Sequence, residues 1–154
     1  EIERVELLCD KYSSDSVDVA KLICDDHPSE NLAFRIFDTD MEASDLSYGD
    51  LKKQSELLSK GLISKGINSG DRIATLMGKS SEYIVTLMAI WRIGAVHVPL
   101  FTAFSTPAIV LRLNGSNAKI VICDETQQAK LKPSKEFKLI KPDNKKIYDF
   151  CGIS

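Results

Sequence analysis

A short segment, residues 78–80, combines the residue types that bind phosphate in nucleotide-binding loops. Gly78, Lys79 and Ser80 lie between an apolar run and a polar helix start, where such a loop belongs. The loop requires the spacing GxxxxGKS/T, because its backbone N–H groups must curl around the phosphates. The position of the first glycine is occupied by Ile73. The segment therefore predicts a structural helix start and not a phosphate site.

Neither histidine is accompanied by a nucleophile. His97 stands between Val96 and Val98 in a predicted strand, so its side chain points either into a hydrogen-bonded core position or toward a cleft. No serine or cysteine lies in a GxSxG-type elbow, which favours the core position. His27 precedes Pro28 in a loop and is predicted on the surface. The sequence thus offers no catalytic residue.

Cysteines and aspartates do not form a metal-binding pattern. Cys9, Cys24, Cys123 and Cys151 are far apart and include no CxxC pair, and the chain has only two histidines. Reduced thiols of a cytoplasmic protein are the favoured interpretation, and a zinc site is not predicted. The many aspartates form no DxDxDG calcium loop. We therefore predict no metal ligands.

The segment after the next apolar run is a candidate ligand-binding loop. Phe101, Thr102, Ala103, Phe104 and Ser105 follow a predicted strand and precede a predicted helix, where open α/β sheets bind ligands. Two aromatic side chains separated by small residues can contact a planar ring while the backbone approaches it closely. Alternatively, both phenylalanines fill the core beneath the following helix. Residue types alone favour that alternative without excluding the first.

Residues 70–105 position these candidates as one strand–helix–strand unit. The apolar run at 73–77 predicts a buried strand, and Ser80 or Ser81 can begin a helix that continues to residue 93. Gly94 suits the helix end, and residues 96–100 restart an extended run. Strands joined through a helix are almost always parallel. The unit therefore predicts an α/β fold with a mostly parallel, helix-flanked sheet.

Further elements surround this unit. Residues 32–37 and 46–48 predict an N-terminal hairpin, and the capping-box pattern of Ser47 and Asp50 begins a helix that ends at Gly66. The remaining expected elements are a helix capped by Asp15 or Ser16 with Val19, Ala20, Leu22 and Ile23 on its apolar face, a helix from Thr106-Pro107 to Asn114-Gly115, a strand at 119–123, a brief helix at 125–131 and a strand at 138–140.

Length and composition limit the class of protein. The 154 residues are 44% hydrophobic and 27% charged, which is typical of one soluble globular domain. The net charge of −2 gives no support to nucleic-acid binding, and no apolar run is long enough to span a membrane. No secretory signal is apparent, so we expect a cytoplasmic protein. Residues 1–131 predict one subdomain, whereas the lysine-rich residues 132–154 predict an edge strand or a linker to an absent remainder.

The order of several motifs resembles the amino-terminal part of an acyl-CoA synthetase of the adenylate-forming, AMP-binding superfamily, in its acetyl- to medium-chain group. The motifs are LSYGDL at 46–51, GDRI at 70–73, RIGAVHVPLF at 92–101 and the stretch 108–123, within a resemblance that covers about residues 16–131. The resemblance implies a parent ligase that uses ATP, coenzyme A and Mg²⁺ to convert a carboxylate to an acyl-adenylate and then to acyl-CoA. The family's phosphate loop, ribose-binding motif and catalytic lysine are expected after Ser154, so the chain alone is expected to be inactive.

The resemblance also implies a coenzyme A site. The segment that matches Phe101, Thr102 and Ala103 borders the coenzyme A nucleotide in acetyl-CoA synthetases, some of which have a glycine pair at the positions of Thr102 and Ala103. Arginines for its phosphates lie near the segment that matches 127–131, where Lys130 is the cation this chain offers. Two alternatives remain open, a stand-alone binding module and an adenylation domain that loads a carrier protein. The uncovered sheet of so short a chain also predicts self-association.

Overall fold

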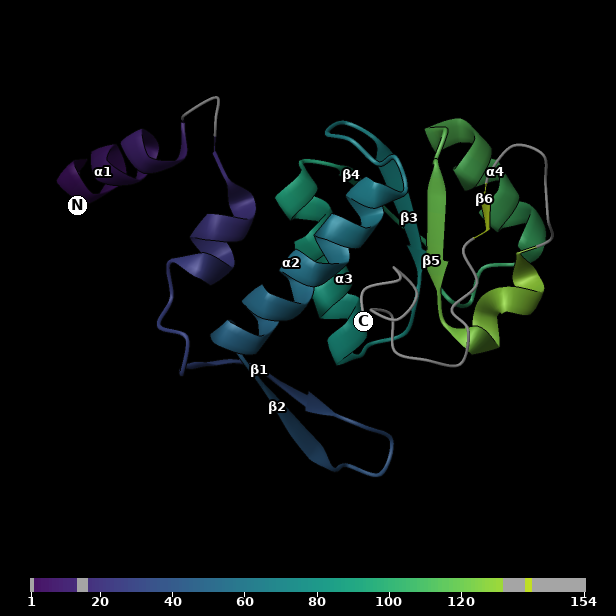
Figure 1. The fold of residues 1–154 in the computed structure, drawn as a ribbon, viewed down its shortest axis with the longest axis horizontal. Coiled ribbons are helices and arrows are strands. Elements are labelled where there is room, and N and C mark those ends of the chain that lie inside the picture. The colour runs from purple at the N-terminus through teal and green to yellow at the C-terminus, as the bar shows by residue number, and fades with distance from the viewer. Residues whose placement is uncertain (1, 14–16, 132–137, 140–154) are drawn as a thin grey trace.

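A four-stranded parallel sheet forms the centre of the computed structural model, which describes residues 2–13, 17–131 and 138–139. Its strands are β3 (Arg72–Leu76), β4 (Val96–Pro99), β5 (Ile120–Cys123) and β6 (Lys138–Leu139), in the order β4-β3-β5-β6 (Figure 1). The predicted α/β fold with a mostly parallel sheet is confirmed. For the strand predicted at 138–140, residue 140 lies outside the described residues.

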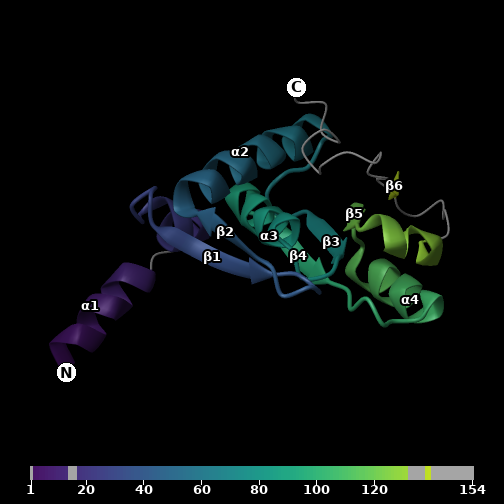
Figure 2. The ribbon, with the colours of Figure 1, turned by 90° about the horizontal axis from the view of Figure 1, so that it is seen from below.

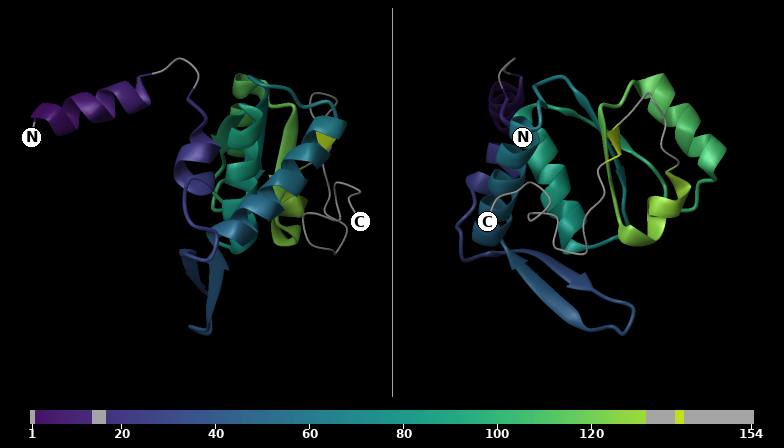
Figure 3. Two further views of the ribbon diagram at one scale, coloured as in Figure 1. Left: turned by 60° about the vertical axis from the view of Figure 1, so that its left-hand side comes forward. Right: turned by 45° about the vertical axis from the view of Figure 1, so that its right-hand side comes forward.

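Helices cover both faces of the sheet. The helix α3 (Ser81–Ile93) connects β3 to β4 on one face, and α4 (Thr106–Ser116) connects β4 to β5 on the other (Figure 3). The long helix α2 (Tyr48–Ser64) packs outside α3. The positions of α3 and α4 follow from two successive crossover connections, which parallel strands require.

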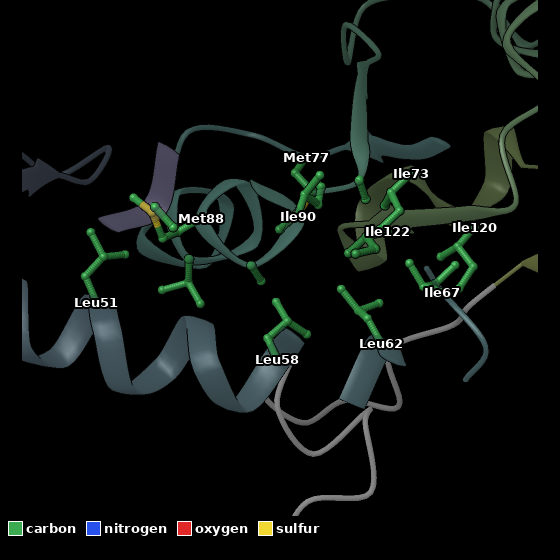
Figure 4. Close-up of a cluster of buried hydrophobic side chains, with 14 of the residues drawn as sticks. Leu51, Leu58, Leu62, Ile67, Ile73, Met77, Met88, Ile90, Ile120 and Ile122 are labelled. Carbon is green, nitrogen blue, oxygen red and sulfur yellow. The ribbon is translucent and has the colours of Figure 1, made fainter. Parts of the chain in front are cut away.

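Alternation along the strands divides the buried side chains into two cores. On the α3 face, Ile73, Ile120 and Ile122 contact the core that also holds leucines of α2 (Figure 4). The residues between them, among them Ala74 and Val121, join the second core beneath α4. A strand that is buried on both faces favours apolar residues at successive positions, which explains the apolar run of β5 and, apart from Arg72 and the buried Thr75, the composition of β3.

The predicted helix signals of the central unit are confirmed. Ser47 is the N-cap of α2, since its side chain accepts a hydrogen bond from the Asp50 N–H at 3.0 Å. Ser80 caps α3 in the same way through the Tyr83 N–H at 3.2 Å. Gly94 ends α3 in the left-handed conformation with φ of 70°. Side-chain oxygens at these N-termini satisfy N–H groups that have no partner within the helix.

The end predicted for α4 is wrong. Asn114 and Gly115 lie inside the helix, which continues to Ser116 and ends with Asn117 in the left-handed conformation at φ of 52°. The Asn117 N–H bonds back to the Asn114 carbonyl at 3.1 Å. Asparagine tolerates this conformation better than most non-glycine residues, so Asn117 supplies the cap.

The brief helix predicted at 125–131 is the 3₁₀ helix η2 (Glu125–Lys130).

The N-terminal elements lie outside the sheet. The helix α1 (Ile2–Tyr12) has no buried residue and stands away from the rest of the chain (Figures 1 and 2). The next helical segment, η1 (Lys21–Asp25), buries Cys24 together with its N-cap Ala20, whereas Val19 and Ile23 are exposed, so the predicted apolar face is correct for Ala20 and wrong for Val19 and Ile23. One side of this segment packs against α2, and residues four positions apart lie on the same side of a helix, so Ala20 and Cys24 are buried together. The predicted caps at 15 and 16 lie outside the described residues.

The predicted N-terminal hairpin is present as β1 (Leu32–Phe37) and β2 (Ala43–Ser47), which pair in antiparallel register. The second strand begins earlier than predicted, and Tyr48 already belongs to α2. Ala33 and Ile36 of β1 pack against the core of the α3 face, while Arg35 and Asp45 form an ion pair at 2.7 Å on the exposed side. The hairpin projects from the amino-terminal end of α2, which follows β2 directly (Figure 1).

Candidate functional site

The loop at the carboxyl end of β4 is held by backbone hydrogen bonds. The Leu100 N–H donates to the Thr75 carbonyl of β3 at 2.9 Å and thereby extends the sheet pairing beyond the strand. Leu100 itself is buried in the core beneath α4. The Phe104 N–H then donates to the Phe101 carbonyl at 2.9 Å, which closes a turn. The segment 101–103 is therefore fixed at an edge of the sheet where α/β folds bind ligands.

The two aromatic residues of this loop have different environments. Phe104 packs against the core beneath α4, but Phe101 leaves 63% of its surface exposed. Their rings meet edge to face, with centroids 5.7 Å apart and an interplanar angle of 84°. The expectation that both phenylalanines fill the core is correct for Phe104 and wrong for Phe101. The exposed ring is available to stack on a planar ligand.

Lys130, the other predicted site residue, contacts the same loop. Its ammonium donates a hydrogen bond to the carbonyl of Thr102, although the two residues are 28 positions apart. Both side chains are partly buried, whereas Ala103 is exposed. The structure therefore brings together the four residues Phe101, Thr102, Ala103 and Lys130 that the resemblance assigned to the nucleotide of coenzyme A. A lysine ammonium has three donors, so two remain beyond the bond to Thr102.

A pocket of about 440 Å³ opens beside Phe101. It lies between the carboxyl ends of β3 and β4, the start of α3 and one side of α4. Its walls are mostly apolar or aromatic, with two cationic side chains, and consist of Met77, Gly78, Lys79, Tyr83, Pro99, Leu100, Phe101, Thr102, Phe104 and Arg112. Sequence reasoning did not identify Arg112. Its spacing of eight residues after Phe104 gave no signal, because the contact depends on where α4 begins.

The segment 78–80 has a structural role. The Gly78 N–H donates to the Asp124 carboxylate at 2.6 Å, and Ser80 is occupied as the cap of α3. Both groups that would face a phosphate in a nucleotide-binding loop are thus engaged within the chain. The prediction of a structural helix start is confirmed, while Lys79 remains exposed at the pocket wall.

His97 is partnered within the fold, as the favoured prediction stated. Its Nε2 lies 2.7 Å from Oγ1 of Thr75, which is buried on the neighbouring strand, and the ring of Tyr83 meets it edge to face. Burial lowers the pKa of His97 below its usual 6.5, because the cationic form loses hydration. His27 is exposed and stacks on Tyr48 with ring centroids 4.3 Å apart.

Residues 24–151 match the family model described as AMP-binding enzyme. The chain belongs to the AMP-binding enzyme family. Among relatives of this AMP-binding chain, the acetyl-coenzyme A synthetase of Chlorobaculum tepidum is 42% identical over 78 residues, which are 51% of this chain and 12% of that protein. The nonribosomal peptide synthetase SIDC of Beauveria bassiana is 27% identical over 112 residues, 73% of this chain and 2% of that protein.

A solved structure supports the same family fold. The crystal structure of an acyl-CoA synthetase from Brucella canis superimposes with a TM-score of 0.77 at 27% identity, and the match covers 88% of this chain and 27% of that one. The AMP-binding chain thus spans about an eighth of the first curated relative and about a quarter of this structure. It corresponds to part of the family's domain.

Within the described part of the AMP-binding chain, no three histidine, cysteine or acidic side chains are grouped closely enough to hold a metal ion. Cys9, Cys24 and Cys123 are free thiols there, and burial raises the pKa of Cys123 to about 11, so this thiol stays protonated. None of the described helices is long and apolar enough to cross a membrane.

Proposed function

We propose that this chain is the amino-terminal part of an ATP-dependent acid–CoA ligase. A carboxylate attacks the α-phosphate of ATP, which forms an acyl-adenylate and releases pyrophosphate. The thiol of coenzyme A then attacks the acyl carbon, forms the thioester and releases AMP and a proton. The similarity to acetyl-coenzyme A synthetase, which is highest of the identities quoted above, is the observation that carries this proposal.

The contribution of this chain is a binding edge for coenzyme A. Phe101, Thr102 and Ala103 form the loop proposed to border the coenzyme A nucleotide, with the ring of Phe101 exposed for stacking. Lys130 supplies a cation at the same loop through its contact with Thr102. Side chains at Thr102 and Ala103, in place of a glycine pair, keep the nucleotide slightly further from the backbone.

ATP and Mg²⁺ are proposed for the complete protein. The segment 78–80 lacks the glycine spacing of a phosphate loop. The metal would supply charge stabilisation for phosphoryl transfer when bound.

We further propose a cytoplasmic protein in which residues 1–131 form the subdomain and 132–154 connect it to the remainder.

The decisive experiment expresses the whole reading frame that contains this sequence and supplies ATP, Mg²⁺, coenzyme A and carboxylates of two to ten carbons. Acyl-CoA and AMP are measured by chromatography. We expect both products in equal amounts, with at least one acid. An active protein that forms acyl-adenylate, detected as hydroxamate, but no acyl-CoA would contradict the proposal.

That outcome would favour the second candidate, an adenylation domain that loads a carrier protein. The similarity to a nonribosomal peptide synthetase over 73% of this chain is the observation in its favour. Absence of adenylate formation with any acid would instead leave a stand-alone binding module.

Self-association of the 154-residue chain is a separate proposal, and light scattering that finds a monomer at high concentration would contradict it.

A further inference from the structure

Two cationic side chains in the wall of the pocket have unused hydrogen-bond donors. Lys79 has no hydrogen bond or ion pair within the described residues, and Arg112 uses one N–H group, which donates to the Ala108 carbonyl at 3.0 Å. The pocket wall contains no aspartate or glutamate. The Asp124 carboxylate accepts a hydrogen bond from the Gly78 N–H. The chain as a whole carries a net charge of −2, so two cations in a pocket wall that has no acidic residue are a local feature.

The aromatic residues fix where the second cation lies. The Arg112 guanidinium lies over the ring of Phe104 with its central carbon 4.0 Å from the ring centroid. Phe104 in turn meets Phe101 edge to face, so Arg112, Phe104 and Phe101 form a continuous row along the pocket. A guanidinium that lies on an aromatic ring keeps its edge donors free for an anion. A planar ligand ring that stacks on Phe101 would therefore lie near the Arg112 guanidinium, which Phe104 holds in place.

We propose that Lys79 and Arg112 bind phosphate groups of the coenzyme A nucleotide and thereby contribute to selection of this substrate. The inference rests on the proposed ligase function and adds two residues to it. Lys130 is held at the Thr102 carbonyl and positions the loop, whereas Lys79, in the loop between β3 and α3, and Arg112, on α4, line the same pocket. Arginine and lysine are the side chains that bind phosphate most strongly.

The test compares Lys79→Met and Arg112→Gln variants of the complete protein with matched variants at exposed positions outside the pocket, Lys60→Met on α2 and Arg4→Gln on α1. KM is measured for coenzyme A, for dephospho-coenzyme A and for ATP, together with kcat. Each pocket variant is expected to raise KM for coenzyme A about three- to tenfold, because a partly hydrated phosphate contact is lost. KM for ATP, kcat and the two control variants are expected to stay at wild-type values.

The arms of this experiment separate the possible failures. A wild-type protein that makes no acyl-CoA overturns the proposed function and the inference with it. A wild-type protein that makes acyl-CoA, with an unchanged KM for coenzyme A in both pocket variants, overturns the inference alone. An increase in KM for ATP instead would assign the two cations to the other nucleotide and also overturn it. A smaller loss for dephospho-coenzyme A than for coenzyme A would support a contact with the 3′-phosphate.

Discussion

Arg92 of α3 donates hydrogen bonds to both carboxylate oxygens of Asp25 in η1, 67 positions earlier, with Nη1 2.8 Å from Oδ2. The same guanidinium reaches Ser55 of α2 through Nε at 2.8 Å. The pair is mostly buried, with 11% of the Arg92 side chain and 18% of the Asp25 side chain exposed. Three helical segments thus meet at one ion pair, which fixes the N-terminal residues against the helices that cover the sheet.

Asp25→Asn is expected to destabilise the chain by about 2 kcal/mol, because it leaves the Arg92 guanidinium buried without its counter-charge. Lys52, which lies 3.7 Å from Asp25, loses its partner too. Urea denaturation followed by circular dichroism gives the free energy of unfolding. Asp26→Asn is the matched control, since Asp26 is exposed, and we expect a change within about 0.5 kcal/mol. Equal stability of the two variants would contradict the structural role of the pair.

Stability is expected to fall at acidic pH for the same reason. The hydrogen bonds from Arg92, with smaller help from the charges of Arg92 and Lys52, lower the pKa of Asp25 below 3.8. A carboxyl with a lowered pKa in the folded state stabilises fully above its unfolded value and loses that contribution as pH falls through the folded value. The wild-type chain should therefore lose its stability advantage over Asp25→Asn below about pH 4. Unfolding midpoints from pH 7 to pH 2.5 measure this, and a constant difference would contradict it.

A second stability prediction concerns the end of α3. A Cβ on Gly94 would lie 2.7 Å from Oγ of Ser69, at a φ of 70° that side chains disfavour. Gly94→Ala is therefore expected to cost about 1–2 kcal/mol. Gly115, inside α4, has nothing within 4 Å of the added atom, so Gly115→Ala should stabilise by about 0.5–1 kcal/mol. Thermal unfolding of both variants checks the sign, and a Gly94→Ala variant at least as stable as Gly115→Ala would refute the argument.

Sequence patterns predicted what is local in this fold. The caps at Ser47 and Ser80 and the left-handed Gly94 depend on neighbours within a few residues, so their residue types are informative. The parallel sheet followed from the strand–helix–strand order, because the connection permits little else. The end of α4 was mispredicted, since by residue type the pair Asn114-Gly115 is the stronger stop signal, although the helix continues to Ser116 and is capped by Asn117.

The candidate site was predictable only in part. The segment 101–103 was identified from its position after a strand and from its resemblance to a family, but the exposure of Phe101 depends on how α4 packs on Phe104. The contact of Lys130 with Thr102 spans the crossover through α4 and the strand β5, and no sequence periodicity predicts it. The pocket cations likewise come from separate segments, Lys79 from the loop before α3 and Arg112 from α4. Contacts of this kind arise from tertiary packing, which a local pattern does not specify.

The last prediction separates the two phenylalanines. Phe104→Ala removes a ring that packs on the core and contacts the Arg112 guanidinium, so we expect a loss of about 2 kcal/mol in the free energy of unfolding. Phe101→Ala removes a mostly exposed ring, and the stability should stay within about 0.5 kcal/mol of wild type. In the complete protein, Phe101→Ala is expected to raise KM for coenzyme A about tenfold through lost stacking, with KM for ATP unchanged. If Phe101→Ala destabilised the chain as much as Phe104→Ala, the ring would be a core residue and its assignment to the ligand site would be wrong.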